Sequence, residues 1–154
     1  MFAFAIAVVL NAVATAAAAP TPVVIVDNPR EIRAMVGAGA DGTFTPSPEE
    51  AEGPRRDLVR FVDARLQREK NKYGREQLNR IRKQADRYFW YCGGYTQKGH
   101  KSLFCTFVLS PPPGQAGPGP KAFPVIKDGG TSVCRCHYDV ESRKVVRLDW
   151  NGEA

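Results

Sequence analysis

Apolar and polar positions follow two different periods along this chain. Between residues 50 and 72, apolar side chains recur every three or four positions, which is typical of one face of a helix. We therefore predict a single amphipathic helix over this range, with an apolar stripe formed by Leu58, Phe61, Val62, Ala64 or Arg65, and Leu66. Ser47 and Pro48 offer an N-cap and a first-turn proline, and Gly74 is the expected C-terminal stop.

The segments on either side of this helix are less regular. Leu78, Ile81 and Ala85 lie at helical spacing, so the sequence allows either a second helix or a continuation of the first. Residues 21–29 are apolar and interrupted by prolines, which favours an extended arm. The following stretch is rich in glycine and is expected to bend easily.

Period-two patterns dominate the C-terminal half and predict four strands, at about residues 87–92, 101–110, 131–140 and 145–150. The first is a run of aromatic residues, which suit a pleated surface. The others alternate, so that one face is shared by Leu103, Cys105, Phe107 and Leu109, another by Cys134, Cys136, Tyr138 and Val140, and a third by Val146, Leu148 and Trp150. Val133, Arg135, His137 and Asp139 are expected on the face opposite Cys134.

This order of elements predicts an α+β fold in which one amphipathic helix covers an antiparallel sheet of four to five strands. We assign residues 19–34 to an N-terminal arm and residues 35–154 to a single domain. Within that domain, residues 111–130 are rich in proline and glycine and predict an irregular insertion.

Residues 1–18 have the pattern of a secretory signal peptide: an apolar run without charge, followed by small residues ending in Ala16-x-Ala18. An uncleaved membrane anchor is the alternative, but the run is short and its end is rich in alanine. We therefore expect a secreted, extracellular protein without a stable membrane span.

The four cysteines, Cys92, Cys105, Cys134 and Cys136, indicate disulfide bonds in such a compartment. If the strands at 101–110 and 131–140 are neighbours, Cys105 is placed to bond Cys134 or Cys136, which leaves Cys92 for the remaining cysteine. A reactive Cys/His pair and a metal site are less favoured. No catalytic cysteine motif is present, and His137 faces away from Cys134 and Cys136 on a strand. We expect no enzymatic activity, metal or cofactor.

Positive charge is concentrated in one segment of this basic protein, whose formal net charge is +6. Residues 55–87 contain twelve Lys and Arg against five Asp and Glu. Such a segment favours an acidic protein, a sulfated glycan or a membrane surface as partner, although it is equally compatible with a solvated helix face. No nucleic-acid partner is expected. The proposed basic face consists of Arg60, Arg65, Arg68, Arg75, Arg80, Arg82 and Arg87.

Three stretches resemble the secreted, type-2 cystatins. "AMVGAGADG" is similar to the cystatin N-terminal trunk, "TQKGHKSLFCTFVL" to the first loop and third strand, and "SVCRCHYDVESRKVVRL" to the fourth strand, second loop and fifth strand. The resemblance runs from about residue 35 to residue 150. It implies a curved antiparallel sheet wrapped around one helix.

Inhibitory cystatins insert a wedge of three segments into the cleft of papain-like, cathepsin-type cysteine proteases, and the resemblance implies the same function here. Gly37 or Gly39 would be the trunk glycine, and Gln97-Lys98-Gly99 would be a shortened first loop without the central valine of the family motif. Gln84 to Tyr88 is a rival alignment for that loop. Glu141-Ser142 follow Val140 where cystatins usually have Pro-Trp, and Trp150 lies further along. The alternative is a non-inhibitory, host-defence module like the cathelicidin pro-regions, acting through the basic face.

Overall fold

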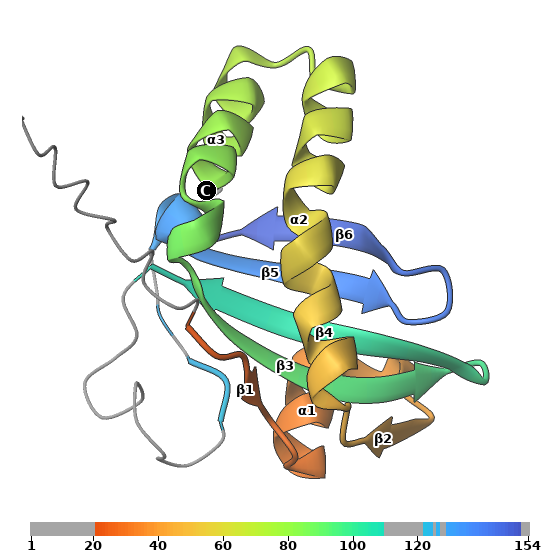
Figure 1. Ribbon diagram of the computed structural model, residues 1–154. Coiled ribbons are helices and arrows are strands. Elements are labelled where there is room, and N and C mark those ends of the chain that lie inside the picture. Colours follow the sequence, from red (N-terminus) through yellow and green to blue (C-terminus); the bar gives the residue numbers. More distant parts are fainter. Residues whose placement is uncertain (1–20, 110–121, 125, 127–128, 152–154) are drawn as a thin grey trace, which may run out of the picture.

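The computed structural model describes residues 21–109, 122–124, 126 and 129–151 of the chain (Figure 1). The predicted signal peptide lies outside the described residues, as does most of the predicted Pro/Gly-rich insertion. The described chain contains the helices α1 (Pro29–Val36), α2 (Pro48–Arg68) and α3 (Lys72–Lys83). Its strands are β1 (Val24–Ile25), β2 (Gly42–Phe44), β3 (Phe89–Gln97), β4 (His100–Val108), β5 (Val133–Asp139) and β6 (Lys144–Trp150).

The three helices pack on an open, mixed sheet of six strands, so the predicted α+β class is confirmed. Strands β3 to β6 are antiparallel and adjacent in chain order, and β2 also pairs antiparallel with β3. The prediction of a purely antiparallel sheet is wrong at β1, which runs parallel to β3 with Val24 opposite Tyr91. This strand is held there because Val26, fully buried, also donates its N–H to Cys92 O.

The N-terminal arm is only partly extended. Helix α1, which the sequence did not predict, begins after Asn28, whose side chain accepts hydrogen bonds from the backbone N–H groups of Arg30 and Glu31. Its buried Ile32 packs on the face of the sheet opposite α2. The helix therefore covers the second face of the sheet, beside the first glycine of the predicted trunk.

The helix predicted over residues 50–72 is found as α2, but its predicted end is wrong, because the helix ends at Arg68 and the chain breaks at residues 69–71. Ser47 and Glu50 form a capping box that starts α2 at Pro48. Asn71 then caps a new helix by accepting from the N–H groups of Tyr73 and Gly74, so Gly74 lies inside α3 instead of ending a helix. The possible second helix is thereby confirmed.

The core lies between the sheet and the helices α2 and α3. Leu58 and Val62 from α2 and Leu78 and Ile81 from α3 are fully buried, which confirms both helical stripes. From the sheet, the Trp90 and Phe107 rings stack on each other with their centroids 4.2 Å apart. A second cluster on the opposite face includes Phe104, Phe123 and Val133.

The last strand departs from its predicted alternation. A β-bulge shifts the β5–β6 register between His137 and Tyr138, so that Val145 and Leu148 both face the core. Val146, predicted to share a face with Leu148, is 58% exposed instead. A bulge adds one residue to one strand and so reverses the facing of the residues beyond it.

Candidate functional site

Three segments that are distant in sequence meet at one end of the sheet, which we call the hairpin end and define as residues 37–41, 97–100 and 140–143 (Figure 1). The first follows α1, the second is the β3–β4 turn and the third is the β5–β6 turn. These are the segments that the sequence predicted as trunk, first loop and second loop. The structure brings them together through hydrogen bonds and one close backbone approach.

The trunk segment is attached to the β3–β4 hairpin. Asp41 donates its N–H to Thr96 O at 2.8 Å, and the carboxylate of Asp41 accepts a hydrogen bond from the N–H of Lys98. Gly39 lies under the side chain of Gln97, so close that a β-carbon at position 39 would stand 2.7 Å from Gln97 Nε2. A larger residue at Gly39 would therefore displace the Gln97 amide.

The tip of the β3–β4 hairpin is a two-residue turn. Lys98 and Gly99 have φ values of +52° and +80°, and they connect Gln97 to its cross-strand partner His100. Positive φ at both central residues matches the type I′ turn that joins twisted antiparallel strands. All four residues are exposed, so the tip is accessible to a partner.

The β5–β6 turn is tied to the same hairpin. His100 Nδ1 lies 3.2 Å from Glu141 Oε2, and Val140 donates its N–H to Lys101 O at 3.2 Å. Within the turn, the N–H of Ser142 donates to Asp139 Oδ1 at 2.8 Å, and this bond holds the pKa of Asp139 below its usual value. The exposed side chains of Glu141 and Ser142 therefore lie beside the first hairpin.

Eight of the nine residues predicted to contact a protease thus belong to the hairpin end: Gly37, Gly39, Gln97, Lys98, Gly99, Val140, Glu141 and Ser142. Trp150 does not. It lies at the opposite end of β6, across from Cys134, with the Arg65 guanidinium carbon 5.1 Å from its ring centroid. The sequence predicted Trp150 at the end of the strand over residues 145–150, and the length of β6 (Lys144–Trp150) separates it from the second loop.

A hollow of about 340 Å³ adjoins the hairpin end on the α1 side of the sheet, and it was not predicted. Its lining includes Gly39, Gln97, Tyr95 and His137. The Tyr95 hydroxyl and His137 Nδ1 are 2.8 Å apart, and burial, with Arg147 nearby, lowers the pKa of His137. Alternation placed His137 on this face, but its partner depends on a β3–β4–β5 register that the sequence does not reveal.

The predicted cysteine pairing is wrong. Cys92 and Cys105 face each other across β3 and β4 and form a disulfide, whereas Cys134 and Cys136 are buried free thiols. The β3–β4 register makes Cys92 the direct neighbour of Cys105, and the sequence does not reveal that register. Burial raises the pKa of Cys134 to about 12, so this thiol is protonated at neutral pH and is a poor nucleophile or ligand. Among the described residues, no group of three or more His, Cys, Asp or Glu is placed to hold a metal ion.

Four of the seven arginines proposed as a basic face make contacts within the molecule. Arg60 pairs with Asp57, and Arg82 Nε lies 2.6 Å from Asp63 Oδ1. Arg75 donates to the carbonyls of Leu66 and Glu69, and Arg65 donates to Leu148 O. The three that make no such contact with the described residues are exposed: Arg68, Arg80 and Arg87.

Comparison with known proteins gave no match to a family model, to a curated protein or to a solved structure. Across the part of the chain that the structure describes, no helix has the length and apolar content needed to cross a bilayer. The geometry of the hairpin end is therefore the main guide to function.

Proposed function

We propose that this protein is a secreted, cystatin-like inhibitor that blocks the active-site cleft of a papain-like cysteine protease with its hairpin end. The observation that carries the proposal is the meeting of Gly39, the Gln97–His100 turn and Glu141 at one end of the sheet. These are the three segments that a cystatin wedge would use. The strand β2, the helix α2 and the consecutive antiparallel strands β3 to β6 also follow the order that the resemblance implies.

The hairpin end is suited to filling a cleft because it is ordered before binding. The Asp41–Lys98 and His100–Glu141 contacts hold the three segments in place, so little conformational entropy is lost when they contact a partner. The exposed side chains at the tip are polar, so we expect recognition by hydrogen bonds and shape, with micromolar rather than tighter affinity.

The turn also explains how the protein would resist cleavage. Papain-like proteases cut a backbone that lies extended in the cleft. Lys98 and Gly99 have positive φ and the flanking residues are paired in a sheet, so this hairpin cannot present an extended backbone without unfolding its end. The Cys92–Cys105 disulfide joins the same two strands and opposes their separation. A buried disulfide also fits the extracellular location that the proposal requires.

The test is a titration of papain and of a cathepsin with the purified protein, followed by hydrolysis of a fluorogenic dipeptide substrate. We expect competitive inhibition at micromolar concentration, weakened about tenfold by Gln97→Ala (about 1.4 kcal/mol). Gln67→Ala is the matched control, because Gln67 is exposed on α2 and distant from the hairpin end. Full protease activity at micromolar protein, or equal effects of the two variants, would contradict the proposal.

A further inference from the structure

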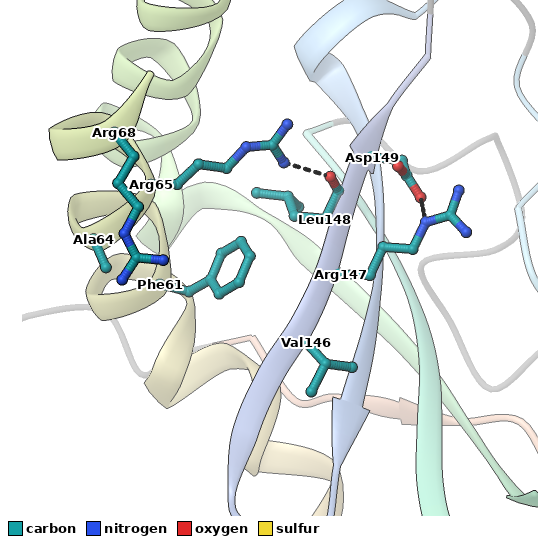
Figure 2. A pocket seen from close by; sticks show the side chains of 8 residues that line it. All are labelled: Phe61, Ala64, Arg65, Arg68, Val146, Arg147, Leu148 and Asp149. Carbon is teal, nitrogen blue, oxygen red and sulfur yellow. Dashed lines mark hydrogen bonds and ion pairs between the residues drawn. The ribbon is translucent and has the colours of Figure 1, made fainter. Parts of the chain in front are cut away.

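A groove of about 540 Å³ runs between α2 and β6, which is the strand at one edge of the sheet (Figure 2). We call it the α2–β6 groove. Its lining includes Phe61, Arg65 and Arg68 from the helix and Val146, Arg147 and Leu148 from the strand. None of these six residues belongs to the hairpin end.

The lining of the groove carries excess positive charge. Arg68 is exposed and makes no hydrogen bond or ion pair with any residue that the structure describes. Arg147 is paired with Asp149, the one acidic residue of the lining, at 2.7 Å, and Figure 2 shows both side chains on the other side of β6 from Arg65 and Arg68. The groove therefore attracts negatively charged groups, and Arg68 is free to bind one.

Apolar surface lies next to this charge. Val146 is one of three large hydrophobic residues that are exposed in the described chain, and the β-bulge places it at the groove. Phe61 is partly buried beneath it on the helix side, and Figure 2 shows its ring between the Arg68 guanidinium and the strand. A bound group that covers Val146 would remove apolar area from water.

The backbone edge of β6 is already engaged at two positions. Arg65 Nη1 donates to Leu148 O at 2.8 Å, crossing from helix to strand in Figure 2, and the N–H of Val145 donates to Asp57 Oδ2 at 2.8 Å. These bonds from α2 oppose the addition of another strand along β6. A ligand in the groove must therefore be recognised through its side chains.

We propose that the α2–β6 groove binds an acidic segment of a partner protein in which carboxylates flank an apolar side chain. One carboxylate pairs with Arg68, the apolar side chain covers Phe61 and Val146, and further carboxylates are attracted by the excess positive charge of the lining. Charge complementarity selects an acidic ligand, and the apolar floor favours a peptide over a sulfated glycan, which has no apolar group to place there. This proposal is independent of protease inhibition.

The experiment measures fluorescence anisotropy of a labelled Glu-Leu-Glu-Phe-Glu peptide against the full chain at low salt. A peptide with Gln at each Glu position tests the charge, and labelled heparin fragments form a second arm. Arg68→Gln and Val146→Ser probe the groove. Arg80→Gln is the matched control, since Arg80 is equally exposed and unpartnered among the described residues but lies on α3.

We expect the acidic peptide to bind with a micromolar dissociation constant that rises about fivefold to tenfold with Arg68→Gln and at least threefold with Val146→Ser. Arg80→Gln should change it by less than twofold. Equal effects of the two arginine variants would show a diffuse charge effect and overturn the proposal. Three other results would also overturn the proposal. One is equal binding of the Gln peptide, and another is the absence of binding at millimolar peptide. The third is heparin binding that Val146→Ser does not change, when the peptide does not bind.

Discussion

Gln97 lies directly over Gly39, with its amide nitrogen where a β-carbon at position 39 would come within 2.7 Å. This contact joins the segment after α1 to the tip of the β3–β4 hairpin. It makes the position of one proposed contact residue depend on the size of another, and the two should therefore be coupled in binding.

Gly39→Ala should weaken protease inhibition by displacing the Gln97 side chain, while it leaves the fold intact because the contacted group is the flexible end of an exposed side chain. A double-mutant cycle measures the coupling. In a Gln97→Ala background, Gly39→Ala should have almost no further effect on the inhibition constant. Additive effects of the two substitutions would mean that Gly39 does not act through Gln97.

Reducing the Cys92–Cys105 disulfide should lower the free energy of unfolding by about 2–4 kcal/mol, because the bond restricts the unfolded chain. The measurement is urea unfolding with and without reductant, combined with mass mapping of the disulfide. Alkylation of the native, oxidised protein should label neither Cys134 nor Cys136, which are buried. A mapped disulfide that contains Cys134 or Cys136 would contradict this pairing.

Stability should fall as the pH drops below about 6.5, because the folded state holds the pKa of His137 below its ordinary value of 6.5. Below this pH the unfolded chain binds a proton that folded His137 resists. The contribution of His137 to stability is therefore fully present above pH 6.5 and is lost as the pH falls from 6.5 to the lowered pKa. Urea midpoints between pH 5 and pH 7 measure the effect. His137→Asn should flatten the profile over this range, and an unchanged profile in this variant would contradict the assignment to His137.

Gly53→Ala should destabilise the protein, although the same substitution at an exposed helix position commonly stabilises by about 1 kcal/mol. A β-carbon at position 53 would stand 2.5 Å from the Tyr138 hydroxyl and 2.7 Å from its Cζ, which requires the buried ring to shift. Overpacking of this kind costs about 1–3 kcal/mol. An increase in the thermal midpoint would show that α2 does not approach β5 this closely.

Local patterns in the sequence identified much of the fold. The stripe around Leu58 and Val62 and the alternation of Leu103, Cys105 and Phe107 are both found in the core, since each reports the period of a single element. The break before α3 was missed because Gly74 is a good stop signal, whereas Asn71 caps the next helix one turn earlier. Two local sequence signals of similar strength therefore disagreed at residues 71–74: Asn71 indicated the start of a helix and Gly74 the end of one.

Features that depend on contacts between distant elements were not predicted. The β3–β4 register decides that Cys105 pairs with Cys92, and the register across β5 and β6 decides that Val146 is exposed. Eight of the nine proposed contact residues were placed together through the cystatin resemblance. The exception, Trp150, lies at the end of the last strand, where the alternation pattern had placed it, and so lies away from the second loop. The α2–β6 groove and the Tyr95–His137 pair need side chains from different elements and have no local sequence signal.

The most direct test of the central claim is amide hydrogen exchange of the protein, alone and bound to papain whose active-site cysteine has been carbamoylmethylated. Binding in the cleft should slow exchange at residues 37–41, 97–100 and 140–143, and leave α3 and the α2–β6 groove unchanged. Complex formation with protection confined to α2 and β6, or the absence of any protection at saturating protease, would contradict the assignment of the hairpin end as the inhibitory surface.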